Sequence, residues 1–402
     1  MRKSALMRCL LALGSLSMAS SLAGAAGVSA QHLGAGLRVA VVGVPHVVPV
    51  VMEARCAEGL ALAGRRPTVP DAPFRALRLA DGRILAFAED STNARFVTSN
   101  FGSIEEVSCQ SLLDWPKQRV DSVLSGAGWI VSPYTVNGND IFALVHVEFH
   151  GWKELKACRE RAALQRRAVN SVCVYDNLSG VWSSDHGASF KPVVGSGTIV
   201  ARFPYNFRVG MNLVGIRDPT NIAWDPEDRK FYFLAWADRY RRQPDGECLF
   251  RNSRLASNGW RAWNGRGFVV KMNSLVVRGP LRQICRPVTN TFLSSLVYSQ
   301  PRHLFLGVGM GPKGVMFASS SNLTSWSRAS LLMRGVRPGE WRVSHSRQMP
   351  SAYYSIVDPR SVSRSYDVIG VNPYLYYVVY GVGINRVKWW NRTLMRVRLS
   401  VR

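Results

Sequence analysis

The sequence lacks the motifs that mark several large classes of enzyme and of nucleic-acid-binding protein. It has no glycine-rich phosphate loop ahead of a helix, no G-x-S-x-G turn to present a catalytic serine, and no nucleic-acid-binding module. It also has no C-x-x-C pair and no histidines at metal-ligand spacing. We therefore expect neither kinase nor serine-hydrolase chemistry, no nucleic-acid partner, no metal and no cofactor.

An uninterrupted apolar run long enough to cross a membrane is also missing from the mature chain. The run Val39–Val51 is broken by Pro45, His46 and Pro49 and is shorter than the roughly 20 residues that a spanning helix needs. A strand at or near the edge of a sheet fits it better. Ahead of it, residues 1–30 combine a basic start, a short apolar core and a small-residue cleavage site, as a secretory signal peptide does. We expect a secreted or periplasmic protein, with an uncleaved anchor as the alternative.

Cysteines are few, and their number after removal of the signal is even. Six remain, which favours disulfides in an exported chain. Buried free thiols are the alternative. Short separations in the sequence favour two local bridges, Cys158–Cys173 and Cys248–Cys285, and the other two cysteines are Cys56 and Cys109.

Acidic residues are scarce, and the shortage is uneven along the chain. There are 51 Lys and Arg against 26 Asp and Glu. From Cys248 onward 23 basic residues accompany only three acids, whereas residues 31–247 hold 25 and 23. Clustered positive charge raises the affinity for polyanions and is screened by salt. An acidic glycan or an anionic envelope surface is the expected partner, and a solvated charged face without a partner is the alternative.

Helical periodicity is scarce as well, and short strands dominate. One stretch, Gly151–Val169, keeps an approximate helical period and predicts a short helical insert. Elsewhere β-branched and aromatic runs alternate with Gly, Pro, Asn and Asp, the mark of an all-β domain. Five of these runs follow polar turn residues, and their strands are expected to begin near Ile84, Ile141, Phe231, Leu304 and Tyr374.

These five starts are spaced by 57, 90, 73 and 70 residues. Repeats of this length, built from short antiparallel strands, are typical of β-propeller blades. We expect residues 31–402 to form a single five-bladed β-propeller of four-stranded antiparallel sheets. A sixth blade built partly from Gly197–Phe203 is one alternative, and a two-domain β-sandwich is another.

Two turns have related sequences. The stretch "WSSDHGASF" (Trp182–Phe190) has the spacing S-x-D-x-G-x-x-F, which resembles the Asp-box of sialidase-type propellers. The stretch "ASSSNLTSW" (Ala318–Trp326) resembles a turn of five-bladed glycosidases, with Asn322 where Asp usually stands. We expect each turn to set a hairpin and to place its aromatic residue between sheets, away from substrate.

A second resemblance to sialidases lies in "FRALRLADGRILAFAED" (Phe74–Asp90), which is similar to the first catalytic blade of that family without its Ile-Pro. The resemblance implies that Arg75 clamps a substrate carboxylate through two parallel bonds. Arg217 and Arg302 begin strand-like runs and are candidates to complete the clamp.

The same resemblance implies a general acid and a tyrosine nucleophile. Asp90 is the candidate acid, and Tyr353 and Tyr354 are candidate nucleophiles by their location. Cleavage of a glycosidic bond usually needs two carboxyl groups that face one sugar, of which one acts as acid and the other as base or nucleophile. The pKa of the acid must be raised by burial or by a negative neighbour.

The stretch "GIRDPTNIAWDPEDRKFYFLAW" (Gly215–Trp236) resembles a different group, the five-bladed furanosidases and arabinan-degrading enzymes. This resemblance implies that Asp218 positions sugar hydroxyls and stabilises the transition state. A turn cap before Pro219 is the alternative. Glu247, beside a cysteine as in invertase-type enzymes, is the implied general acid. The third carboxylate of that family has only Asp140 as a stand-in.

Aromatic side chains offer faces on which sugars stack, and "NGWRAWNG" is expected to be an exposed loop. The candidates are Trp224, Trp236, Trp260, Trp263, Trp389 and Trp390. The sequence thus predicts an exported, carbohydrate-active propeller that hydrolyses an acidic or furanosidic glycan. The competing hypothesis is a non-catalytic propeller that binds an anionic glycan, an envelope surface or a protein partner.

Overall fold

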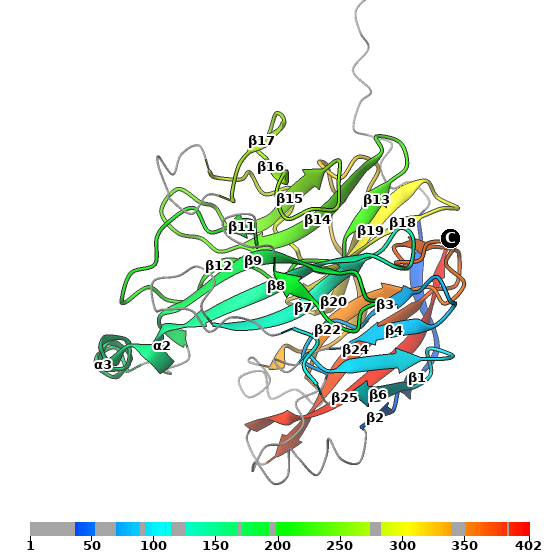
Figure 1. Ribbon diagram of the computed structural model, residues 1–402, viewed down its shortest axis with the longest axis horizontal. Coiled ribbons are helices and arrows are strands. Elements are labelled where there is room, and N and C mark those ends of the chain that lie inside the picture. Colours follow the sequence, from blue (N-terminus) through cyan, green and yellow to red (C-terminus); the bar gives the residue numbers. More distant parts are fainter. Residues whose placement is uncertain are drawn as a thin grey trace, which may run out of the picture. The chain divides into compact units, whose positions relative to one another are not determined.

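The computed structural model describes residues 37–52, 70–88, 93–108, 110–113, 126–166, 171–192, 198–273, 283–338, 350–383 and 386–402. The expected signal peptide lies outside them. Within them the chain is mostly β (Figure 1), which confirms the all-β class. Two short helices, α2 (Gly151–Glu154) and α3 (Lys156–Leu164), lie where the helical insert is predicted. None of the described helices is long and apolar enough to span a bilayer.

The described strands follow one another in five antiparallel groups. The first contains β3 (Arg75–Arg78), β4 (Ile84–Phe87), β5 (Arg95–Thr98) and β6 (Ile104–Ser108), with β2 (Val50–Val51) parallel to β6. The second contains β7 (Ala127–Tyr134), β8 (Ile141–His150) and β9 (Val174–Ser183), with β10 (Lys191–Pro192) and β11 (Ile199–Arg202) both against β9. The third has β12 (Val214–Arg217) and β13 (Ala223–Asp225) against β14 (Lys230–Ala237), then β15 (Gly246–Asn252), β16 (Arg261–Trp263) and β17 (Phe268–Val270).

The last two groups complete the set. The fourth contains β18 (Phe292–Ser299), β19 (Leu304–Gly311), β20 (Gly314–Ser320) and β21 (Ser330–Arg334), with β23 (Val368–Ile369) parallel to β18. The fifth contains β22 (Ser351–Val357), β24 (Tyr374–Gly383), β25 (Arg386–Val401) and β1 (Val39–Val47). A parallel pairing of β9 with β12 joins the second and third groups into one sheet.

The predicted strand starts mark the second strand of every group. Four of them, β4, β8, β19 and β24, begin at the predicted residue, and β14 begins one residue early. An apolar run directly behind a polar turn is therefore a reliable sign of these strands. The segment Ile199–Arg202 pairs with β9 as an outer strand and forms no group of its own.

Strand β1 lies at the edge of its sheet, as the sequence predicts for this proline-interrupted run. It pairs with β25 and with no other strand described, in an antiparallel register that joins Val39 to Val401. Several of its valines stay exposed, among them Val44 at 68%. The first described strand of the chain thus completes the sheet of the last group.

Five apolar clusters lie between consecutive groups, and one of them lies between the fifth group and the first. In that cluster the ring of Phe74, ahead of β3, stacks on Tyr376 of β24 with centroids 4.4 Å apart. The other four clusters join the first group to the second, the second to the third, the third to the fourth and the fourth to the fifth. Each sheet is therefore packed on both faces.

Side-chain hydrogen bonds join the groups as well. Asn221 is one example, because both its donor and its acceptor bond to a neighbouring group. Its Nδ2 donates to the carbonyl of Leu296 on β18 at 2.6 Å, and its Oδ1 accepts from the amide of Leu296 at 2.9 Å. Asn221 lies between β12 and β13 and is buried. The side chain of Asn221 thus links the third group to the fourth by two hydrogen bonds.

Replacing Asn221 by alanine is expected to lower the free energy of unfolding by about 2 to 4 kcal/mol, because the buried N–H and C=O of Leu296 lose their partner. Urea titration measures the loss. Asn139→Ala, at an exposed turn position, is the control and should change stability by no more than about 0.5 kcal/mol. Equal effects of the two substitutions would contradict this account.

Both local disulfides predicted from the sequence are present. Cys158–Cys173 ties α3 to the residue before β9, and Cys248–Cys285 anchors β15. Cys56 and Cys109 lie outside the described residues.

The two turns that share a sequence pattern are closed by side-chain hydrogen bonds. In the β9–β10 turn, Asp185 Oδ1 accepts from the amides of Ala188 and Ser189. The turn places Phe190 in the apolar cluster between the first and second groups. In the turn after β20, Asn322 Oδ1 takes the aspartate's place and accepts from the amide of Ser325. These contacts are structural, as the sequence predicts for both turns.

Candidate functional site

A cavity of about 970 Å³ is lined by residues from all five groups. Its charged and titratable residues come from different strands and loops: Asp71, His146, Glu148, Arg217, Asp218, Arg337 and Arg392. Its aromatic residues are Trp129, Trp236, Phe292, Tyr353, Tyr354, Tyr380 and Trp389. Size and composition match those of sites for small ligands, in which a few polar groups stand among apolar and aromatic surfaces.

Asp71 lies on one side of the cavity, in the segment that leads into β3. Its Oδ1 accepts a hydrogen bond from the Tyr353 hydroxyl at 2.9 Å and forms an ion pair with Arg392 Nη1 at 2.6 Å. Burial raises the pKa of Asp71, although Arg392 and Tyr353 act in the opposite direction. Burial also raises the pKa of Tyr353 well above its usual value, so this phenol stays neutral and donates to Asp71.

Asp218 lies on the opposite side, where Arg217 holds it. The Arg217 guanidinium contacts Asp218 through Nη1 and pairs with Asp238 through Nε at 3.2 Å. Arg217 belongs to β12, which pairs with β14, and Asp218 is the residue that follows β12. One arginine thus fixes two carboxylates at the end of a strand.

Glu148 reaches the same side from β8. Residues two apart on a strand point to one face, so His146, Glu148 and His150 form a row. Glu148 Oε2 lies 2.8 Å from His150 Nε2, and its Oε1 lies 3.9 Å from His146 Nδ1. Burial raises the pKa of Glu148, but His150, His146 and Arg217 outweigh it and bring the pKa below its usual value. Glu148 is therefore ionised at neutral pH.

His146 lies among three carboxylates. Its Nδ1 is 3.8 Å from Asp218 Oδ1 and its Nε2 is 3.8 Å from Asp176 Oδ2, in addition to the approach to Glu148. Burial opposes its charged form, but Asp176, Glu148 and Asp218 together raise the pKa of His146 to about 9. Asp176 is fully buried on β9, and burial raises its pKa to about 6. Gly215 permits this packing, because a Cβ there would meet the Asp176 Cβ at 2.5 Å.

The raised pKa of His146 makes stability depend on pH. Its contribution is fully present below its unfolded pKa of about 6.5 and is lost as pH rises toward about 9. We expect the free energy of unfolding to fall across this window, and to fall less in His146→Gln. Urea titrations at both ends of the window measure the difference, with His46→Gln on the exposed strand β1 as control. A fall of the same size in His146→Gln would contradict the assignment.

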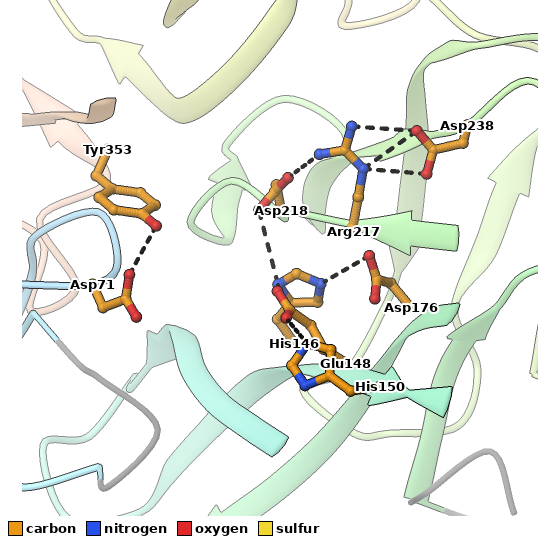
Figure 2. A network of polar contacts seen from close by, with 9 residues as sticks. All are labelled: Asp71, His146, Glu148, His150, Asp176, Arg217, Asp218, Asp238 and Tyr353. Atoms are coloured by element: carbon orange, nitrogen blue, oxygen red, sulfur yellow. Dashed lines mark hydrogen bonds and ion pairs between the residues drawn. The ribbon is translucent and has the colours of Figure 1, made fainter. Parts of the chain in front are cut away.

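Figure 2 shows the two sides together: Asp71 and Tyr353 face Asp218, Glu148 and His146 across the space that these residues line. Tyr353 and Asp218 both have positive φ, at +57° and +49°. Non-glycine residues rarely adopt this conformation, and when they do it often marks a functional site.

Of the three arginines predicted to bind substrate, one lines the cavity and two do not. Arg217 lines the cavity. Arg75 is buried, donates to Ser355 Oγ and to the Ser294 carbonyl, and is not among the residues that line the cavity. It ties β3 to β22 and β18, which is a structural use. Arg302 belongs to the turn between β18 and β19 and does not line the cavity either.

Of the four predicted carboxylates, one lines the cavity, two do not, and one lies outside the described residues. Asp218 lines the cavity. Glu247 is completely buried on β15, where its Oε1 accepts from the Leu293 amide at 2.8 Å, and it does not line the cavity. Asp140 lies in the exposed turn before β8. Asp90 lies outside the described residues.

Sequence reasoning missed five of the seven charged or titratable residues named above for the cavity: Asp71, His146, Glu148, Arg337 and Arg392. A signal for two of them was present, because H-x-E-x-H on a predicted strand places both histidines and the glutamate on one face. Asp71 had a weaker signal, a position just ahead of the first strand of a repeat. Among the described residues, no cluster of three His, Cys, Asp or Glu side chains is arranged to hold a metal ion.

The aromatic predictions are mixed. Trp236 and Trp389 line the cavity, as does Trp129, which was not singled out. The expectation of an exposed loop at "NGWRAWNG" is wrong: Trp260 is buried, and its ring packs edge-on against Phe233 at 4.7 Å.

No protein-family model and no curated protein sequence matches this chain. Among solved structures it is similar to a family 117 glycoside hydrolase from Zobellia galactanivorans, with 7% identity, 89% of each chain covered and a TM-score of 0.48. It is also similar to an endo-1,5-alpha-L-arabinanase from Thermotoga petrophila, with 9% identity, 81% of this chain and 70% of that chain covered, and a TM-score of 0.42. For an exo-beta-1,3-galactanase from Phanerochaete chrysosporium the identity is 10%, 88% of this chain and 64% of that chain are covered, and the TM-score is 0.42. At these values the function has to be argued from the site itself.

Proposed function

We propose that the five strand groups are the blades of a five-bladed β-propeller. Apolar clusters lie between every pair of consecutive groups and also between the last and the first. Contacts among the first strands support the same arrangement, since β22 contacts both β18 and β3, and β3 contacts β7. A two-domain sandwich would leave one of these boundaries unpacked.

We propose further that the protein is an exported glycoside hydrolase whose active site is the large cavity. The observation that carries this proposal is the placement of Asp71 opposite Glu148 and Asp218 on the cavity walls. Two carboxyl groups on opposite sides of a sugar are the usual requirement for cleaving a glycosidic bond.

The electrostatics of the walls suggest a role for each carboxyl group. Asp71, whose pKa is raised by burial, is assigned as the general acid that protonates the leaving oxygen. Glu148, held ionised by two histidines, is assigned as the base or nucleophile. Asp218, fixed by Arg217, is assigned to hold sugar hydroxyls and to stabilise the positive charge of the transition state.

The substrate class follows from the remaining lining. Trp129, Trp236 and Trp389 offer aromatic faces for sugar rings. Arg337 adds positive charge to the lining, which favours an acidic glycan, whereas the charge of Arg392 is balanced by Asp71. Burial raises the pKa of Tyr353 well above its usual value, which disfavours the phenolate that a sialidase-type tyrosine nucleophile would need.

A hydrolysis screen tests the proposal. The purified protein is offered chromogenic uronides, sialosides and arabinofuranosides beside Asp218→Asn, with Asp81→Asn at an exposed site as control. Turnover that is lost in Asp218→Asn and kept in Asp81→Asn is the expected result. Binding of these sugars without turnover would favour the non-catalytic alternative.

The hydrogen bond from Tyr353 to Asp71 makes a prediction about pH. Tyr353→Phe keeps the ring and removes a donor that favours the ionised carboxylate, so the pKa of Asp71 rises further. Because the acid must be protonated to act, activity falls as pH rises through this pKa. We therefore expect the alkaline limb of the kcat/KM profile to move to higher pH in Tyr353→Phe. A limb that stays in place would contradict the role of Asp71 as acid.

A further inference from the structure

The catalytic cavity leaves one strong feature of the sequence unexplained, the excess of positive charge after Cys248. From Cys248 to Gly339 the sequence contains no acidic residue. A second, smaller depression of about 440 Å³ lies within this part of the chain, on the third strand group. Its lining is entirely polar or small: Asn252, Ser253, Arg254, Ala256, Asn258, Gly259, Arg261, Lys271 and Asn273.

Three cations stand around this depression without an acidic partner. In the part of the chain that the structure describes, no ion pair joins Arg254, Arg261 or Lys271 to a carboxylate. In contrast, Arg251, directly opposite Arg261 in the β15–β16 register, pairs with Asp228 at 3.4 Å and stacks over Phe268. Cations that line one depression repel one another, and an anion bound among them would offset this repulsion.

The loop that forms the depression is held in place before any ligand arrives. Asn252 is buried, and its Nδ2 donates to the Asn258 carbonyl at 2.9 Å across the loop. Gly259 has φ of +95°, and a Cβ there would meet Asn252 Oδ1 at 2.8 Å. The indole of Trp260 donates to the Ala256 carbonyl at 2.7 Å beneath the loop. A rigid loop loses little entropy when it binds a ligand.

We propose that this depression binds the anionic groups of an acidic glycan chain, at a site separate from the catalytic cavity. Arg254 and Arg261 supply planar donor pairs that match carboxylate or sulfate oxygens, and Lys271 adds a point charge. The asparagine amides and Ser253 offer donors and acceptors to sugar hydroxyls. The volume of the depression lies within the range of small-ligand sites. The proposal does not depend on whether the cavity is catalytic.

Isothermal titration calorimetry tests it with three tetrasaccharides: oligogalacturonate as the carboxylate probe, a sulfated galactan as the sulfate probe, and a neutral galactan. We expect one or both anionic probes to bind and the neutral one to bind at least about tenfold more weakly. Affinity should fall as salt rises from about 50 to 300 mM. The stronger anionic probe identifies the group that the site prefers.

Matched variants separate a site from diffuse charge. Replacing Arg254, Arg261 and Lys271 together by alanine should weaken binding at least about tenfold. The control removes the same charge by replacing Arg161, Arg166 and Lys191, which are exposed and line neither cavity, and should leave binding within about twofold. Lys271→Glu serves as a second variant at an exposed position if the triple variant is poorly folded.

Hydrogen exchange of the unchanged protein with the bound probe locates the contact, and protection is expected over Asn252–Arg261. Equal weakening by both triple variants, protection confined to the large cavity, or no binding of either anionic probe at low salt would each overturn the proposal.

Discussion

Asp71→Asn is expected to lower kcat/KM by about 10²- to 10⁴-fold on glycosides with poor leaving groups, the range for loss of a general acid. The amide keeps the shape of the side chain and can still accept from Tyr353, but it gives up the charge that pairs with Arg392, so the Tm of the variant is measured beside its activity. On dinitrophenyl glycosides, whose leaving group departs without a proton, the loss should be much smaller. The measurement is the dependence of kcat/KM on the pKa of the leaving group, which should steepen in the variant.

The comparison with the dinitrophenyl substrate distinguishes two ways of being wrong. If Asp71→Asn is equally impaired on all leaving groups, Asp71 acts as base or nucleophile and the roles across the cavity are exchanged. If the variant retains full activity on all of them, the cavity is not the active site. Asp81→Asn, an exposed carboxylate paired with Arg83, is the matched control and should behave like the unchanged protein.

Glu148→Gln is expected to lose about 10²- to 10⁴-fold in kcat/KM whatever the leaving group, because the carboxylate that attacks or activates water is gone. Azide is small enough to enter the space that the shorter side chain of Glu148→Ala leaves, and it should restore turnover of activated substrates by that variant with glycosyl azide as product. The configuration of that azide and of the normal product, measured by NMR, tells whether Glu148 is the base of an inverting reaction or the nucleophile of a retaining one.

Glu247→Gln provides the contrast for this experiment. Glu247 is buried, and its Oε1 accepts from the Leu293 amide, so its substitution should affect stability more than the chemical step. Azide rescue of Glu247→Ala but not of Glu148→Ala would show that the base had been assigned to the wrong glutamate.

The sequence allowed the strands to be predicted better than the site. Turn chemistry ahead of an apolar run is a local property, so the second strand of each group could be located to within one residue. Asp218 could be predicted because R-D-P is also a local pattern. Glu247 shows the limit: an E-C pair says nothing about which face of β15 the side chain takes, and Glu247 points into the protein interior.

The remaining residues of the site depend on contacts across long separations. Asp71 and Tyr353 are 282 residues apart and meet only because the first and fifth groups pack together. Arg75 looked like a ligand clamp from its neighbours in the sequence, but its partner Ser355 is 280 residues away. Periodicity and spacing do not indicate which residues far apart in the sequence contact each other. The burial and the hydrogen-bond partners of these residues are therefore seen only in the structure.

The pairing of β1 with β25 has a consequence for how the chain folds. Val39 finds its partner only when Val401 is present, so the sheet of the fifth group cannot be completed until almost the whole polypeptide has been synthesised. Such long-range pairing slows folding and leaves a hydrophobic edge exposed in the meantime. Removing either β1 or β25 should therefore damage the same sheet, and an incomplete chain exposes that sheet's edge to chaperones and proteases.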